Sequence, residues 1–107
     1  MKSKLFRDFH DDLVKSLHDP KEAQAYLDAA LEQGDKKYFL KALRNVAEAW
    51  GGIGKVASGT KLNRESLYKT LSENGNPKME TVEEVLEFFG CRLAVQSREK
   101  KLTTAHR

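Results

Sequence analysis

The spacing of apolar residues along this chain predicts several short helices. Four segments, within residues 5–17, 20–33, 35–50 and 79–89, place apolar residues three or four positions apart, which is the repeat of one helix face. The side chains expected to face a core are Phe6, Phe9, Leu13 and Leu17; Ala23, Tyr26, Leu27, Ala30 and Leu31; Phe39, Leu40, Leu43, Val46, Ala47 and Trp50; and Met79, Val82, Val85, Leu86 and Phe89. The pattern favours an all-α fold, because each helix must bury its apolar side against another element.

Capping residues mark where these helices begin and end. Asp19 precedes Pro20, and a side-chain acceptor followed by proline at the first helical position is typical of a helix start. Asp35 stands in the same capping position before the third segment. Gly34 and Gly90 follow the apolar stripes of their helices, where glycine readily takes the left-handed conformation that ends a helix.

Residues 53–72, IGKVASGTKLNRESLYKTLS, predict two shorter helices joined by a tight turn. The first is expected from about Ile53 to Thr60, and the second from Arg64, with Asn63 as its N-cap. The apolar sides of the two helices comprise Val56, Ala57, Leu67 and Leu71. This arrangement is a helix-turn-helix, whose second helix enters the major groove in proteins that bind DNA.

The remaining segments divide the chain into three parts. Residues 1–34 are expected to form an N-terminal helical extension, and residues 35–96 a helix-turn-helix domain, giving five or six helices in all. Polar and apolar residues alternate from Cys91 to Gln96, which predicts a short C-terminal strand. Residues 97–107 lack any apolar period and are rich in basic residues, so we expect them to form a mobile basic tail.

Positive charge is unevenly distributed along the chain. The formal net charge is only +3 and the pI about 9.0, which by itself does not indicate a nucleic-acid partner. Residues 36–50 carry four basic residues against one acidic residue, and residues 51–78 carry five against two. Residues 79–90 instead carry four glutamates and no basic residue. The positive charge is therefore concentrated on the predicted helix-turn-helix, the helix before it and the basic tail, a distribution that fits a DNA-binding protein.

Composition and spacing argue against other classes of protein. A single cysteine, Cys91, excludes an internal disulfide framework and a cysteine-based zinc site. His10, His18 and His106 lie in the flanks, without the spacing of a catalytic triad or a metal site. No apolar run reaches the roughly 18 residues of a membrane span. We therefore expect a cytoplasmic protein that is not an enzyme and that uses no cofactor or metal ion.

Three phrases of the sequence resemble a known family. They are DPKEAQAYLDAALEQGD, FLKALRNVAEAWGGIGKVA and LNRESLYKTLSENGNPKMETVEEVLEFFG, which lie within residues 19–95. Residues 35–95 are similar to the Xre/Cro type of helix-turn-helix domain found in phage repressors. More narrowly, the chain resembles the addiction-module antidote proteins, the HigA-like antitoxins.

The resemblance implies an antitoxin of a type II toxin–antitoxin module. Such a protein binds its own operator in double-stranded DNA as a homodimer and represses its own transcription. It also neutralises a toxin of the RelE/HigB ribonuclease kind by protein–protein binding. Two alternatives remain open: a stand-alone phage-type repressor without a toxin partner, and a protein-interaction module whose helix-turn-helix no longer binds DNA.

Two positions depart from the pattern of this family. Lys61 occupies the turn position where glycine is usual, and Lys78 the position where Ser or Thr normally caps the next helix. A lysine in that turn must either tolerate or avoid a positive φ, a conformation that glycine adopts without strain. We therefore expect the geometry of the turn to depend on Lys61.

The helical period assigns candidate DNA-base contacts to the second helix of the pair. With Leu67 and Leu71 toward the core, a rotation of about 100° per residue places Glu65 and Lys69 nearest the outward face. Arg64 lies at the N-terminus, the end that such helices direct at base edges. Arg64 is suited to pair with guanine, Glu65 to accept from cytosine, and Lys69 to reach guanine or phosphate. The alternative for all three is an ordinary exposed helix face.

Other polar residues of this region are candidates for contacts to DNA phosphates, which set the register and the salt dependence of binding. They are Lys55, Lys61, Asn63, Ser66, Asn74 and Asn76. For Asn74 and Asn76, ordinary turn chemistry is the alternative.

Candidates for an apolar dimer surface are Phe88, Leu93 and Val95. A toxin is expected to bind residues 1–18 or the acidic helix 79–89, whose glutamates otherwise form a solvated face.

Overall fold

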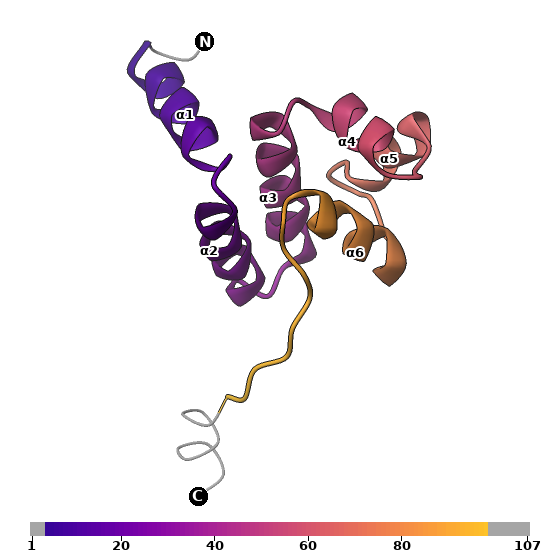
Figure 1. The fold of residues 1–107 in the computed structure, drawn as a ribbon. Helices are drawn as coiled ribbons and strands as arrows, with labels where there is room; N and C mark the ends of the chain where they lie inside the picture. Colours follow the sequence, from indigo (N-terminus) through magenta and orange to yellow (C-terminus); the bar gives the residue numbers. More distant parts are fainter. Residues whose placement is uncertain (1–3, 99–107) are drawn as a thin grey trace, which may run out of the picture.

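A computed structural model describes residues 4–98 of the chain, with side chains described from Asp8 onward. These residues form six α-helices and no strand (Figure 1). The helices are α1 (Lys4–Ser16), α2 (Pro20–Glu32), α3 (Lys36–Ala49), α4 (Ile53–Gly59), α5 (Arg64–Thr70) and α6 (Met79–Phe88). The all-α class is therefore confirmed. Over this described part, no helix combines the length and the apolar character needed to cross a bilayer.

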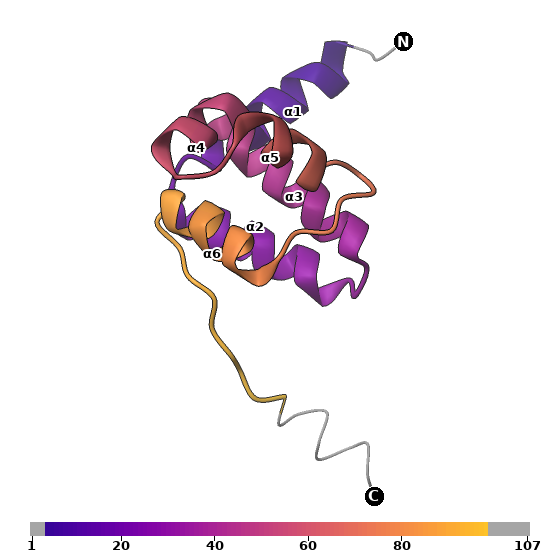
Figure 2. The ribbon, with the colours of Figure 1, turned by 90° about the vertical axis from the view of Figure 1, so that its right-hand side faces the viewer.

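Helix α3 lies at the centre of the fold. It packs against α1 and α2 on one side and contacts α4 on the other, while α4 in turn contacts α5 and α6. Figure 1 shows α1 and α2 to one side of α3 and the other three helices opposite. The segment after α6 leads away from the helices in both views (Figure 2).

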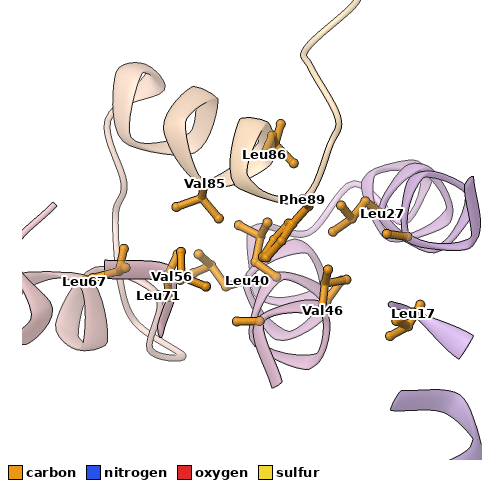
Figure 3. Packing of buried hydrophobic residues seen from close by; sticks show 14 of the residues in the cluster. Leu17, Leu27, Leu40, Val46, Val56, Leu67, Leu71, Val85, Leu86 and Phe89 are labelled. Atoms are coloured by element: carbon orange, nitrogen blue, oxygen red, sulfur yellow. The ribbon is translucent and has the colours of Figure 1, made fainter. Parts of the chain in front are cut away.

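A continuous cluster of buried apolar side chains joins the two sides of the molecule. Phe89, which is fully buried, projects from the end of α6 toward Leu40 and Val46 of α3 and Leu27 of α2 (Figure 3). The buried members of the cluster are Leu17, Ala23, Leu27, Leu40, Ala42, Leu43, Val46, Ala47, Val56, Ala57, Leu67, Leu71, Val85, Leu86 and Phe89. The inner faces of the helix-turn-helix and of the N-terminal helices thus share one core.

The helix boundaries follow the predicted capping residues. The Asp19 carboxylate accepts a hydrogen bond from the backbone N–H of Lys21 at 2.9 Å, and Asp35 accepts one from Lys37 at 2.9 Å. Gly34 and Gly90 both have φ of +78°, the left-handed conformation expected at the ends of α2 and α6. The side chain of Lys78 makes no capping hydrogen bond to α6.

The predicted C-terminal strand is wrong. Residues 91–98 have irregular backbone. The last backbone hydrogen bond within the described chain is the one that the Cys91 N–H donates to the Leu86 carbonyl, at 2.8 Å. Alternating polarity produces a strand only when a second strand supplies hydrogen-bond partners, and none of residues 4–98 forms a strand. The predicted basic tail falls on residues 97–107, of which 99–107 lie outside the described residues.

Three predicted core residues instead face solvent. Phe9 is 73% exposed, Leu31 52% and Met79 71%. Met79 is the first residue of α6, whereas the buried residues of that helix, Val85 and Leu86, lie in its second half. Helical spacing identifies which side of a helix is apolar, but it does not say how much of that side another element covers.

Candidate nucleic-acid interface

Helices α4 and α5 form the predicted helix-turn-helix. The side-chain oxygen of Asn63 accepts a hydrogen bond from the Ser66 N–H at 2.9 Å, which confirms Asn63 as the N-cap of α5. The Thr60 hydroxyl donates to the Val56 carbonyl at 2.9 Å and accepts from the Leu62 N–H at 3.2 Å. One threonine side chain therefore bridges the end of α4 and the turn that leads to α5.

The turn is built without a left-handed residue. Within residues 4–98 no residue other than glycine has a positive φ, so Lys61 avoids the conformation that glycine usually supplies here. Thr60 is extended, with φ of −123° and ψ of −170°, and its hydroxyl closes the turn. The backbone of Lys61 is consequently free of the strain of a positive φ, and its side chain is exposed.

The inner face of the pair is buried as predicted. Val56, Ala57, Leu67 and Leu71 all belong to the core. A contact from α3 adds to this packing: Nη1 of Arg44 donates to the carbonyl oxygen of Leu71 at 2.6 Å, at the end of α5. The arginine satisfies a carbonyl that the helix itself leaves unpaired. Because Arg44 and Leu71 are 27 residues apart, this contact could not be predicted from the local sequence.

The outer face of α5 is polar and exposed. Its exposed residues are Arg64, Glu65, Ser66, Tyr68 and Lys69. The three candidate base contacts, Arg64, Glu65 and Lys69, therefore lie on the accessible side of a helix whose opposite side is fixed in the core. That these side chains contact bases stays a prediction.

Arg64 packs against two neighbours. Its Cζ lies 5.7 Å from the centroid of the Tyr68 ring, one turn further along α5. On α4, a Cβ added to Gly54 would lie 3.3 Å from Nε and 3.4 Å from Cζ of Arg64. The guanidinium group thus lies against the backbone of the preceding helix.

The candidate phosphate contacts are accessible to solvent. Lys55, Lys61, Asn63, Ser66, Asn74 and Asn76 are all exposed. The side-chain oxygen of Asn76 lies 3.4 Å from Nζ of Lys36, and Nζ of Lys37 lies 4.0 Å from the carboxylate of Glu73. The basic first turn of α3 therefore adjoins the loop that follows α5, although 40 residues separate Lys36 from Asn76.

The three candidate dimer residues are not gathered into one patch. Phe88 is half-buried, with its ring 6.1 Å from that of Trp50, and it occupies space over Gly59 that a Cβ there would overlap. Leu93 is 39% exposed and lines a different cleft, of about 520 Å³, between α2 and residues 91–96. Val95 is fully exposed.

Comparison with known proteins gives two matches. Residues 8–97 match the sequence profile of a family described as "Probable addiction module antidote protein". A protein of Haemophilus influenzae, described as uncharacterized, is 33% identical over 85 residues, which cover 79% of this chain and 87% of that protein. No solved structure matches the chain.

Proposed function

The chain belongs to the family of probable addiction module antidote proteins, and from this premise we propose that it is a HigA-like antitoxin of a type II toxin–antitoxin module, which also represses its own operon. Membership in the family carries an antitoxin role and a toxin partner of some kind. The proposal adds an Xre-type mode of DNA binding, a homodimer, and a toxin of the RelE/HigB kind. Operator binding requires that the protein reside in the cytoplasm.

The observation that supports DNA binding best is the way α5 is held. Its N-terminus is capped by Asn63, its inner side is buried through Leu67 and Leu71, and its C-terminal end is tied to α3 by Arg44. A helix fixed on every side but one can enter the major groove without rearrangement. In this mode Arg64 would pair bidentately with a guanine, and Glu65 and Lys69 would contact neighbouring base edges.

The lysines around this face supply the sequence-independent part of binding. Lys55 lies on α4 and Lys61 in the turn between α4 and α5, while Asn74 and Asn76 follow α5, so these residues would contact phosphates along the groove. Each phosphate neutralised by a lysine releases counterions and steepens the salt dependence of affinity.

Titration of two DNA duplexes tests the repressor function. One duplex carries the promoter region upstream of the gene for this chain, and the other is a scrambled duplex of equal length and composition. We expect tighter binding to the promoter duplex, measured by fluorescence anisotropy, and an affinity that falls steeply with salt. Equal affinity for both duplexes at every salt concentration would contradict operator recognition.

A lysine substitution tests the phosphate contacts. Lys61→Ala should weaken binding to both duplexes alike and reduce the slope of log affinity against log salt by about 1. Lys21→Ala, on α2 at the other side of α3, removes the same charge away from the interface and is the matched control. An unchanged slope in Lys61→Ala would remove Lys61 from the phosphate contacts.

Antitoxicity would come from covering the toxin. A ribonuclease of the RelE/HigB kind binds RNA phosphates and therefore presents a basic surface. The acidic surface of the two candidates is α6, with the exposed residues Glu80, Glu83 and Glu87, whereas the acidic residues of α1 are matched by an equal number of basic ones. Helix α6 would therefore complement a basic partner by charge.

Coexpression tests the toxin partner. The product of a small neighbouring reading frame, usually upstream in this family, should co-elute with this chain in gel filtration and lose its growth inhibition. If there is no such reading frame, or if its product does not bind, the stand-alone repressor is the better account.

The operator would be read by a homodimer. Two helix-turn-helix units related by a two-fold axis read half-sites about one helical turn apart. Leu93 and Val95 lie on a segment whose backbone makes few hydrogen bonds within the described chain, and Phe88 lies at the end of α6. Sedimentation of Leu93→Asp and Val95→Asp variants, with the wild type as reference, tests these residues as a dimer surface.

A further inference from the structure

We propose that Tyr68 is a positioning residue that, together with the bare backbone at Gly54, fixes the orientation of the Arg64 guanidinium before DNA binds. The inference rests on the proposed role of Arg64 as a base reader. In addition, Arg64 is already oriented in the free protein, and Tyr68 and Gly54, which are not among the predicted DNA contacts, contribute to sequence discrimination.

The first observation is the stacking of Arg64 on Tyr68. The two residues are one helical turn apart, the spacing at which side chains meet on a helix surface. The distance of 5.7 Å from Cζ to the ring centroid lies within the range of a cation–π contact. Tyr68 is 47% exposed and Arg64 is exposed as well, so the contact lies at the protein surface.

The second observation is independent and concerns α4. Gly54 lies in the first turn of α4 and does not have a positive φ, so its backbone conformation does not require glycine. Glycine is also an unfavourable residue within a helix. The neighbour that a side chain at Gly54 would crowd is Arg64, with Nε at 3.3 Å and Cζ at 3.4 Å from an added Cβ. Glycine here makes room for the guanidinium.

The two contacts restrict Arg64 from two different helices, α5 and α4. A free arginine side chain samples many rotamers, and ordering it at a base edge opposes binding. A guanidinium that lies near both the Tyr68 ring and the α4 backbone has lost part of that freedom beforehand. It also keeps its planar fork in one orientation, which bidentate pairing with guanine needs.

Tyr68→Leu and Tyr68→Phe separate positioning from direct contact. A cation–π contact at an exposed site corresponds to roughly two- to fivefold in affinity. Tyr68→Leu should therefore lower the preference for the promoter duplex over the scrambled duplex by about two- to fivefold. Tyr68→Phe retains the ring face and should keep the preference. Neither change alters the charge, so the salt slope should stay the same.

Gly54→Ala provides a readout that a merely structural role would not produce. Alanine is the better helix former, so the thermal midpoint should stay the same or rise. The added Cβ displaces the guanidinium by a few tenths of an ångström, and the preference for the promoter duplex should fall. We therefore expect Gly54→Ala to be at least as stable as the wild type but to discriminate less between the two duplexes, because the Arg64 guanidinium is displaced.

NMR of the free protein supplies a test without DNA. In the wild type the Arg64 side-chain protons next to the guanidinium should show an upfield ring-current shift, retained in Tyr68→Phe and lost in Tyr68→Leu.

A double mutant tests whether Tyr68 acts through Arg64. When Arg64 is already alanine, Tyr68→Leu should have no further effect on duplex preference.

The outcomes distinguish the two levels of the proposal. If the wild type shows no preference for the promoter duplex, the proposed function fails and this inference fails with it. If the wild type discriminates but Tyr68→Leu and Gly54→Ala discriminate equally well, only the positioning role is overturned. The same conclusion follows if Tyr68→Leu lowers the preference in full when Arg64 is already alanine.

Discussion

At the residue scale, the loop between α5 and α6 depends on the missing side chain of Gly75. Gly75 is buried, and a Cβ at this position would overlap the carbonyl group of Thr70, the last residue of α5. Because the opposing atoms belong to the backbone, no flexible side chain can move aside. The composition of residues 73–77 predicts a loop, but this close approach exists only after the chain has turned back on α5.

Gly75→Ala should therefore destabilise the protein. We expect a loss of about 1–3 kcal/mol in the free energy of unfolding, since overpacked sites typically cost this much. Urea denaturation followed by circular dichroism measures it. Asn74→Ala, at the exposed neighbouring position, is the control and should stay within about 0.5 kcal/mol of wild type. A Gly75→Ala midpoint equal to that of the control would disprove the close approach.

Cys91 provides a pH-dependent test at the same scale. Burial raises the pKa of the Cys91 thiol, and the nearby Asp28 carboxylate raises it further. Folding thus favours the protonated thiol, and this contribution to stability is lost as the pH rises through the elevated pKa. Alkylation by iodoacetamide should be slower in the folded protein than in urea, with its pH midpoint shifted upward. A folded-state midpoint at or below that of the unfolded chain would contradict this environment.

At the scale of elements, α5 is too short to be stable alone. It spans seven residues, and isolated helices of that length are marginal in water. The Asn63 cap, the apolar contacts of Leu67 and the hydrogen bond from Arg44 together hold it in place. The orientation of the reading face therefore depends on all three.

Removal of the cap should loosen α5. Asn63→Ala deletes the acceptor for the Ser66 N–H and should lower the free energy of unfolding by about 1 kcal/mol. Asn63→Asp retains an acceptor and serves as the control. Hydrogen exchange of amides in residues 64–70 locates the effect: faster exchange there in Asn63→Ala but not in Asn63→Asp is expected. A uniform change along the chain would argue against a local cap.

Sequence pattern predicted these elements where the signal is local. Asp19, Asp35 and Asn63 each cap a helix within two or three residues, so their role can be recognised from neighbours alone. The strand at residues 91–96 failed because a strand also needs a distant partner. Lys61 showed that a turn usually made by glycine can be closed by the hydroxyl of Thr60.

At the scale of the whole molecule, Phe89 connects the helices on both sides of α3. It is fully buried, and its ring centroid lies 5.9 Å from that of Trp50 and 6.2 Å from that of Phe88. The core face could be predicted from helical spacing. The packing of Arg64 on Gly54 and of Lys36 beside Asn76 could not, because these contacts follow from how α3, α4 and α5 are placed in space.

Phe89→Ala should destabilise the entire fold. A cavity of this size typically lowers the free energy of unfolding by about 3–5 kcal/mol. Trp50 is the only tryptophan and contacts Phe89, so its fluorescence reports the transition. Fluorescence and circular dichroism should give coincident curves in the wild type, because one core joins all the described helices. Separate transitions by the two probes would show that the N-terminal helices fold independently.

The affinity of Arg64→Ala for the promoter duplex and for the scrambled duplex tests the central claim most directly. We predict that the variant, with an unchanged thermal midpoint, loses about 1–3 kcal/mol of binding free energy to the promoter duplex, while its binding to the scrambled duplex changes little. Equal losses on the two duplexes, or no loss on either, would contradict the account of α5 as the helix that reads DNA.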